Sequence, residues 1–594
     1  MSFTTRPEIQ GTFGVVASTH WLASAAGMAA LERGGNAFDA AVAAGFVLQV
    51  VEPHLNGPGG EVPIILHNAA SGRQQVICGQ GVAPSAATIE RYRDLGLDLV
   101  PGSGLLATVV PGAFDAWMLL LRDHGSLRPR EVLEFAIGYA EEGYPLVAGI
   151  AAKIAVVRDL FLKEWPTSAA VYLPGGDVPA AGNRFRNPVL AAAYRRLVDE
   201  AEAKTRDRDG QIEALRDAWY RGFVAEAIDA FCRETSWLDT SGQRHGGLLT
   251  ADDLAGWQAT KEAPVTYECW GHTFCKTRPW GQGPVFLQQL ALLEDRDLAS
   301  LDPLGPDFVH FVTEAAKLAF ADRDAFYGDP DHVDVPLEAL LSRDYNSARR
   351  ALLSDTASLE LRPGQVPGHP GTVDVEAAIR RLQLANDTLG GGEPTLEADL
   401  VGGDTCHLDV VDRHGNMVSA TPSGGWLHGS PVIPDLGFCL NTRAQMFWLE
   451  ESHPASLAPG KRPRTTLSVN LVLRDGEPYM VFGTPGGDYQ DQWTLTFALR
   501  HLHHGMNLQE AIDAPAFQTD HLVDSFWPRG ADLGSLAIEG RFPEATISEL
   551  KKRGHRVTVV DDWSLGRLSA AVKDGDLLKA AANPRLMQGY AVGR

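Results

Sequence analysis

Thr405 stands where a glycine-rich acidic segment meets a predicted strand. Residues 400–421 read LVGGDTCHLDVVDRHGNMVSAT, so Gly402, Gly403 and Asp404 directly precede Thr405. A threonine hydroxyl is a weak nucleophile, but an N-terminal threonine carries a base in its own α-amine. Cleavage of the bond between Asp404 and Thr405 would create that terminus. The pattern therefore predicts self-cleavage at this bond and a nucleophile at Thr405.

Such a nucleophile attacks a carbonyl group and needs donors for the resulting oxyanion. Gly486 and Gly487, in GTPGGDYQDQW (483–493), lie between a predicted strand and a predicted helix. Glycines allow a close backbone approach, and amides at a helix N-terminus attract anions. Such a pair is more often only a turn. Thr465 and Thr466, in PGKRPRTTLS, offer two hydroxyls to a substrate or to a turn of their own.

Other reactive side chains carry less weight. The histidines of HLHHG (501–505) suit the negative end of a helix, and no carboxylate is spaced with them, so we expect no metal and no cofactor. Strand alternation turns Cys406 away from the face of Thr405 and into the core. His407 is interpreted as a packed residue of the hairpin, because the α-amine already supplies a base.

Composition excludes several classes of partner. The 594 residues are 44% hydrophobic and 21% charged and carry a net charge of −23, which repels nucleic acid and anionic membranes. The N-terminal residues lack the pattern of a signal peptide, and the apolar stretch 37–51 is shorter than the roughly 20 residues that span a bilayer. The six cysteines form no CxxC pair, which is typical of reduced thiols. We expect a cytoplasmic protein without a nucleic-acid or membrane partner.

Strand pairs followed by helices recur in both halves of the chain, which predicts stacked sheets with helices outside. Asn36 is the predicted N-cap of a helix over 37–51, and residues 354–404 are rich in helix breakers and predict a flexible linker. Predicted strands cover 13–19, 62–68, 74–81, a hairpin over 405–421 and a second hairpin within 465–487; predicted helices include 20–35, segments of 111–235, 306–325 and 491–505.

Motifs in both halves resemble the γ-glutamyltranspeptidase family of N-terminal-nucleophile hydrolases over nearly the whole chain. The N-terminal half carries GGNAFDAAVAA (34–44), VVEPHLNGPGGE (50–61), GVAPSAAT (81–88) and VPGAFDAW (110–117), and the C-terminal half carries the motifs around Thr405, Thr465 and Gly486. The resemblance implies class α/β with an αββα sandwich. It also implies a precursor cut into residues 1–404 and 405–594, which remain together as two subunits of one sandwich.

The same resemblance assigns roles to the reactive residues. It places Thr405 as the nucleophile and Gly486 and Gly487 as the oxyanion hole. Ser423 falls at the position of a second threonine that supports the nucleophile's hydroxyl, and serine keeps that hydroxyl.

The family's residues for gripping the two charged ends of glutamate are altered here. Its carboxylate-binding arginine corresponds to Ile89, with Arg91 and Arg93 nearby only after a shift. The remaining changes are Gly425 for an asparagine, Arg443 for an amide and Met446 for an acid in LNTRAQMF (440–447), and Thr465 and Thr466 for two serines. Losing these ion pairs removes several kcal/mol of glutamate recognition.

Arg443 is a new cation at this position. We expect it to bind a carboxylate of a different acyl group, with Asp488 as part of the substrate region. The alternative is that Arg443 forms an ion pair with an internal acid such as Asp488.

The favoured function is hydrolysis of an amide or acyl bond in a small molecule, with non-glutamyl specificity. Three alternatives remain: a true γ-glutamyl hydrolase or transpeptidase acting on glutathione-like compounds, a hydrolase of a C–C bond next to a carbonyl, and an unprocessed, non-catalytic binding protein. Hydrolysis is favoured over transfer because no acceptor-site signature is found. The expected partners are the substrate and the two precursor fragments, and a homo-oligomer is left open.

Overall fold

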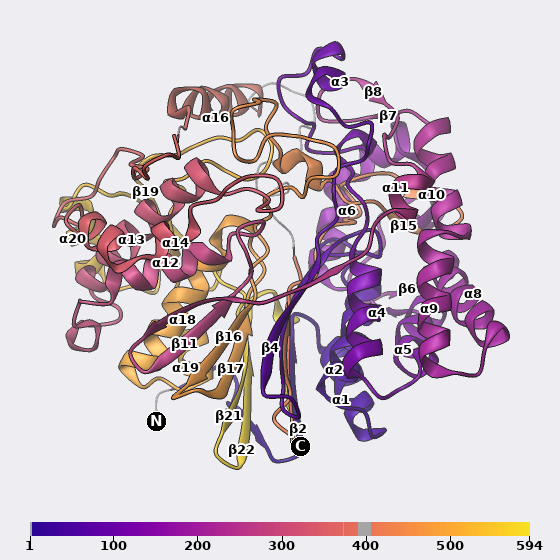
Figure 1. Ribbon diagram of the computed structural model, residues 1–594, viewed down its shortest axis with the longest axis horizontal. Helices are drawn as coiled ribbons and strands as arrows, with labels where there is room; N and C mark the ends of the chain where they lie inside the picture. The colour runs from indigo at the N-terminus through magenta and orange to yellow at the C-terminus, as the bar shows by residue number, and fades with distance from the viewer. Residues whose placement is uncertain (1–2, 372, 390–404) are drawn as a thin grey trace.

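Two seven-stranded sheets are stacked face to face in the computed structural model, which describes residues 3–371, 373–389 and 405–594 (Figure 1). The first sheet has the order β1-β22-β21-β17-β16-β11-β10, and the second has the order β23-β2-β12-β13-β3-β4-β9. Apolar side chains from both sheets form the core between them. Helices cover both outer faces, so the predicted αββα sandwich is confirmed (Figure 1).

The strands of the two sheets come from both halves of the chain. The first sheet contains β1 (Ile9–Gly11), β10 (Val265–Cys269), β11 (His272–Lys276), β16 (Asn470–Arg474), β17 (Glu477–Gly483), β21 (Ser569–Asp574) and β22 (Leu577–Ala582). The second contains β2 (Gly14–Ser18), β3 (Val62–Asn68), β4 (Arg73–Gly79), β9 (Thr260–Glu262), β12 (Leu408–Asp412), β13 (Met417–Ala420) and β23 (Tyr590–Gly593).

One helical layer covers the second sheet. Its inner helices are α1 (Trp21–Glu32), α2 (Ala37–Val51) and α4 (Ala113–His124), and α5 (Pro129–Glu142), α8 (Pro188–Lys204) and α9 (Arg208–Tyr220) lie outside them. Every residue of α2 is buried, and its many alanines suit this close packing. Asn36 caps α2 as predicted, in a capping box with Asp39.

The other layer covers the first sheet with α12 (Gly283–Leu293), α13 (Pro306–Phe326), α18 (Gln490–His504) and α19 (Leu508–Asp513). Gly505 ends α18 in the left-handed conformation, with a φ of 64°, as expected of a glycine after a helix. In the described part of the chain, no helix combines the length and the apolar character that crossing a bilayer requires.

The segment after Thr405 runs through the middle of the second sheet. β12 pairs antiparallel with β2 on one side and with β13 on the other, and all five of its residues are buried. The strand therefore holds the chain just beyond Thr405 rigidly between the opposite sheet and α2.

The predicted flexible linker over 354–404 contains a helix that the prediction did not include. Within it, α16 (Val375–Leu389) is a helix with an amphipathic sequence, so a prediction from helix breakers at its two ends missed it. Residues 390–404, which include Asp404, lie outside the described residues.

Candidate active site

Two hydroxyl groups meet at the start of the central strand pair. Thr405 forms an antiparallel bridge with Ser423, and the Cys406 N–H donates to the Pro422 carbonyl at 2.9 Å. Thr405 Oγ1 and Ser423 Oγ lie 3.2 Å apart, and both residues are at most 1% exposed. The structure thus brings together the predicted nucleophile and the hydroxyl predicted to support it.

The loop GPGG (57–60) packs its backbone directly on the segment after β13 that contains Ser423. Glu61 and Ser423 exchange two backbone hydrogen bonds, at 2.9 and 3.0 Å. A Cβ atom at Gly60 would lie 2.0 Å from the Ser423 carbonyl oxygen, so only glycine fits there. In the sequence, this loop was recognised only as part of the family motif 50–61, and its role in positioning Ser423 was missed.

Arg443 is fully buried and lies against Ser423. Its Nε donates to the Glu61 carboxylate and its Nη2 to Ser423 Oγ. The guanidinium also lies over the Trp426 ring, 5.0 Å from its centroid. The alternative of an ion pair with an internal acid is confirmed, but the acid is Glu61, from far along the chain, and not Asp488.

Glu61 compensates the charge of Arg443 within the core. Burial raises the pKa of Glu61 to about 7, although the Arg443 charge opposes this shift. The Arg443 charge is therefore directed at Glu61 and Ser423, and the expectation that it faces a substrate carboxylate finds no support in this geometry. Met446, at the position of the family's acid, packs with Trp426 and Phe526 as an apolar cluster.

Ser423 can connect Arg443 to Thr405 through two hydrogen bonds. A guanidinium only donates hydrogen bonds, so Ser423 Oγ accepts from Arg443. A hydroxyl can accept and donate at once, which allows Ser423 to donate to Thr405 Oγ1. In that direction, the bond stabilises negative charge on the threonine oxygen.

Gly486 and Gly487 adopt positive φ angles of 128° and 55° between β17 and α18. A Cβ atom at Gly486 would lie 2.3 Å from the Trp493 ring. Within the described part of the chain, neither glycine N–H has a hydrogen-bond acceptor, whereas the Gly487 carbonyl accepts from Gln282 at 3.3 Å. Two such amides are suited to hold an anion.

This glycine loop begins against the strand of Thr405. A Cβ atom at Gly483, the last residue of β17, would lie 2.2 Å from the His407 ring. His407 itself is buried, 2.9 Å from Thr421 Oγ1 and 3.0 Å from Asp409 Oδ1. The packed role expected for His407 agrees with these contacts.

Behind the nucleophile, Cys406 points into the helix-covered core, as strand alternation predicts. Its Sγ donates to Glu52 at 3.0 Å, and Thr19 Oγ1 donates to the same carboxylate at 2.6 Å. Burial raises the pKa of Glu52 to about 7. Gln588 donates to the other oxygen of Glu52.

Of the residues expected to contact substrate, Asp488 is committed to protein partners. It accepts from Arg323 and, at 2.8 and 2.6 Å, from the N–H and O–H of Ser525. Burial would raise its pKa, but the Arg323 and Arg464 charges hold the pKa of Asp488 below its usual range.

The two threonines of the PGKRPRTTLS loop differ in their contacts. The Thr465 N–H donates to the Trp280 carbonyl at 2.8 Å. Thr466 Oγ1 is buried and has no hydrogen-bond partner among the described residues, so it remains available for a ligand. Farther away, Arg93 on α3 (Ile89–Asp94) pairs with Glu451 at 2.8 Å.

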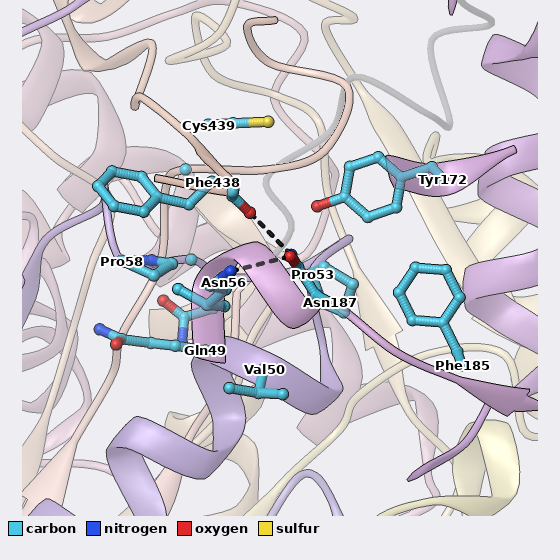
Figure 2. A pocket seen from close by; sticks show the side chains of 14 residues that line it. Gln49, Val50, Pro53, Asn56, Pro58, Tyr172, Phe185, Asn187, Phe438 and Cys439 are labelled. Atoms are coloured by element: carbon cyan, nitrogen blue, oxygen red, sulfur yellow. Dashed lines mark hydrogen bonds between the residues drawn. The ribbon is translucent and has the colours of Figure 1, made fainter. Parts of the chain in front are cut away.

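Gly425 has a φ of 66° and lines a small cavity beside the end of α2 (Figure 2). The cavity holds about 10 Å³, near the minimum for one water molecule. Two of its lining residues are bonded to each other: Asn187 donates to the Gly437 carbonyl at 2.7 Å. This cavity is too small for a substrate, so it gives no support to the expectation that Gly425 contacts one.

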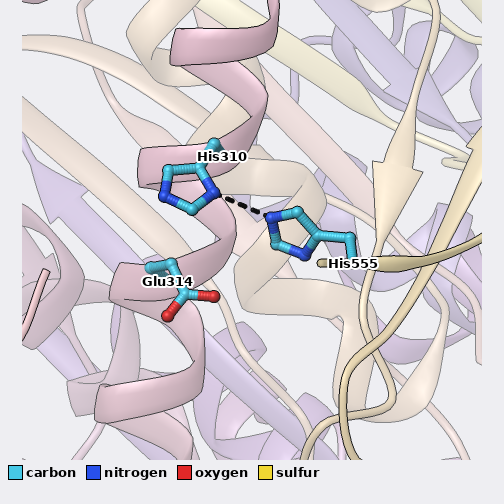
Figure 3. A group of neighbouring side chains, drawn as sticks. All are labelled: His310, Glu314 and His555. Atoms are coloured by element: carbon cyan, nitrogen blue, oxygen red, sulfur yellow. Dashed lines mark hydrogen bonds between the residues drawn. The ribbon is translucent and has the colours of Figure 1, made fainter. Parts of the chain in front are cut away.

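One group of side chains has the composition of a metal site. Ligand atoms of His310, Glu314 and His555 lie within 4.8 Å of one another (Figure 3). However, His310 Nδ1 and His555 Nε2 are hydrogen-bonded at 2.8 Å, and Glu314 accepts from Lys317 at 2.6 Å and Arg362 at 3.3 Å. Two cations already satisfy this carboxylate, so the group fits a metal poorly.

The histidines of HLHHG take no part in this group. His501 is bonded to Tyr479 at 2.6 Å and to the Met506 carbonyl at 2.7 Å. The absence of a metal stays a prediction.

Comparison with known proteins supports one family over the whole chain. The family model of gamma-glutamyltranspeptidase matches residues 23–593. The chain is 32% identical to the glutathione hydrolase-like YwrD proenzyme of Bacillus subtilis (98% of this chain, 99% of the relative). It is also 32% identical to the oxamate amidohydrolase proenzyme of Klebsiella pneumoniae (98% of both chains).

Solved structures share the same architecture. The structure of LmbA2991T421A is 55% identical over the full length of both chains, with a TM-score of 0.94. A cephalosporin acylase from Bacillus halodurans is 27% identical, covering 100% of this chain and 98% of its own, with a TM-score of 0.83.

Proposed function

Since this chain belongs to the γ-glutamyltranspeptidase family and is an N-terminal-nucleophile hydrolase, we propose that it is a self-processing threonine enzyme that cleaves an amide bond in a small molecule. The observation that carries this proposal is the buried Thr405–Ser423 pair, with hydroxyl oxygens 3.2 Å apart at the first residue of the central hairpin. The relatives are named as proenzymes, which supports processing.

Processing begins at the Asp404–Thr405 bond. Thr405 Oγ1 attacks the Asp404 carbonyl carbon, its proton passes to the Thr405 nitrogen, and the peptide bond is exchanged for an ester. Water then hydrolyses the ester, leaving a carboxylate on Asp404 and a free α-amine on Thr405. The fragments 1–404 and 405–594 stay together, because β12 lies between strands of both fragments, β2 and β13.

In the processed enzyme, the Thr405 α-amine accepts the hydroxyl proton as Oγ1 attacks the substrate carbonyl carbon. The N–H groups of Gly486 and Gly487 hold the oxyanion. The proton passes to the leaving amine, the acyl group remains on Oγ1, and water releases it as a carboxylic acid. Ser423 steadies Oγ1 throughout.

The acyl group differs from glutamate in this proposal. Arg443 is paired with Glu61, and Met446 belongs to an apolar cluster with Trp426 and Phe526. Met446 therefore offers no charge to an α-amine at the position of the family's acid. The second candidate is hydrolysis of γ-glutamyl compounds, which the 32% identity to the YwrD relative favours; a γ-glutamyl anilide assayed beside uncharged acyl anilides separates the two.

Replacing Thr405 by alanine tests the central step. We expect a single uncut polypeptide of 64.1 kDa without hydrolytic activity, whereas Thr405→Ser keeps a hydroxyl and still yields the two fragments. Intact mass spectrometry resolves these species and also detects an acyl adduct on the smaller fragment. A cut and active Thr405→Ala protein would disprove the mechanism.

A further inference from the structure

A second cavity lies between the C-terminal end of α13, residues 373 and 374 before α16, the segment 448–464 and Val523. It holds about 190 Å³, and the polar and aromatic residues that line it include Asp324, Asp374, Trp448, Glu450, His453 and Arg464. This volume is below the 300–1,000 Å³ typical of a site for a whole drug-sized ligand. The cavity therefore suits one end of a small molecule.

Arg464 is the cation of this cavity and is only 3% exposed. Among the residues that the structure describes, its guanidinium has one hydrogen-bond partner, Ser525 Oγ, at 2.8 Å from Nη1. The nearest carboxylate, Asp324, is 4.0 Å from Nη2. A buried guanidinium with five donors and one partner has donors left for a ligand.

Asp324 compensates the charge of Arg464 only in part, because its hydrogen bonds go to other groups. It accepts from Arg323 at 2.8 and 2.9 Å and from the Val523 N–H at 3.0 Å. Asp488 and Asp524 also act on the Arg464 charge from a distance, but most of its N–H donors have no acceptor among the described residues.

Two further arginines, Arg529 and Arg381, lie beside Trp448, which lines the cavity. The Trp448 ring lies 4.6 Å from the guanidinium of Arg529 and 5.1 Å from that of Arg381. Arg529 donates only to carbonyl oxygens of Gln445 and Phe447, and its buried Nη1 has no partner among the described residues. Burial and the Arg323 charge lower the pKa of Arg464 to about 10, and burial and the Arg464 charge lower the pKa of Arg529 to about 9, so both stay charged at neutral pH.

The cavity is connected to the proposed catalytic groups. Ser525 bonds Arg464 through its Oγ and bonds Asp488, the residue after Gly487, through its N–H and O–H. The next residue, Phe526, lies under the Arg443 guanidinium at 5.8 Å. Because Arg443 donates to Ser423, a chain of contacts connects the cavity lining to the residue beside the nucleophile.

From these contacts we infer that the cavity is a subsite for a carboxylate group of the substrate, bound by Arg464 at its base with an apolar or aromatic body against Trp448. Planar guanidinium groups bind carboxylates with two parallel hydrogen bonds, which are stronger than bonds between neutral groups. Asp374 and Glu450 at the exposed rim repel a second negative charge. The ligand class is thus a monocarboxylate at this end of the molecule.

This subsite rests on the proposed function for its role in the reaction, but its binding chemistry can be measured alone. The probes are benzoate and benzamide, which share size and ring and differ in charge. Saturation-transfer NMR titrations at low ionic strength give their dissociation constants for the wild type, for Arg464→Gln and for the control Arg91→Gln on the exposed face of α3.

Benzoate should bind the wild type at least tenfold more tightly than benzamide. Arg464→Gln should remove this difference, and Arg91→Gln should leave it unchanged. Equal binding of the two probes by the wild type, or an unchanged preference in folded Arg464→Gln, overturns the subsite. If Arg464→Gln fails to fold, the test rests on the comparison of the two probes with the wild type and on Arg464→Lys. This variant should retain a preference for benzoate.

The results also separate the subsite from the function. A protein that binds benzoate through Arg464 but shows neither cleavage nor amide hydrolysis keeps the subsite and loses the proposed function. A protein that cleaves itself and hydrolyses neutral amides but ignores the charge of benzoate keeps the function and loses the subsite.

Discussion

Replacing Arg443 by glutamine tests whether this residue acts on the nucleophile or on the substrate. The guanidinium donates to Ser423 Oγ, which lies 3.2 Å from Thr405 Oγ1. Hydrogen bonds from charged donors contribute about 1.5–3 kcal/mol. If that amount stabilises charge on the threonine oxygen, self-cleavage should slow by about 10- to 150-fold, at about 1.4 kcal/mol for each factor of ten.

Self-cleavage is the informative assay because it needs no bound substrate. A time course of precursor loss on denaturing gels gives the rate directly. Hydrolysis of an uncharged acyl anilide by the processed fraction should show a lower kcat with little change in KM. Wild-type cleavage by Arg443→Gln, or a raised KM with unchanged kcat, would refute the positioning role and support substrate binding.

Stability provides a second check through Glu61. Glu61→Gln leaves a buried guanidinium that cannot lose its proton, and the expected loss of unfolding free energy is about 3–5 kcal/mol. Arg443→Gln should cost less, because Glu61, whose pKa burial already raises to about 7, can become neutral. Urea unfolding on a Thr405→Ala background keeps a single chain, and the double variant should recover part of the loss.

The remaining predictions concern the glycine loop, the acid behind the strand and the second hydroxyl. Gly486→Ala puts a Cβ atom 2.3 Å from the Trp493 ring and should lower the rate of hydrolysis at least about 100-fold. The control Gly505→Ala, whose Cβ atom would have no neighbour within 4 Å, should keep its activity. Equal activities of the two variants would contradict the oxyanion role. Glu52 has a folded pKa of about 7 against 4.5 for the exposed group, so its contribution is fully present below pH 4.5 and is lost as the pH rises through 7, about 3 kcal/mol in all. Urea unfolding at pH 5 and pH 8 measures this loss of unfolding free energy, which should be smaller in Glu52→Gln than in the wild type. The same loss in both proteins would be inconsistent with a buried, protonated Glu52. Ser423→Ala should slow self-cleavage without abolishing it, and complete loss in a folded protein would assign Ser423 a larger role.

Local chemistry made a large part of the fold predictable. The Asn36 cap, the alternation of the 405–421 hairpin and the glycine after α18 each depend on neighbours a few residues away, so the sequence contains the full pattern. The order of the motifs likewise predicted the family and the αββα sandwich. The helix α16 was missed because flanking breakers outweighed its own amphipathic pattern.

The partners of the charged side chains could not be predicted in this way. Arg443 was correctly recognised as unusual, but its ion pair with Glu61 spans 382 residues, and nothing in the sequence indicated that Arg464 lines a cavity. Residue types set which side chains can carry charge, hydroxyls or flexible glycines. Only the packing of the two sheets decides which of these are paired, which remain free for a ligand, and which lie beside Thr405, because those contacts join segments that the sequence keeps far apart.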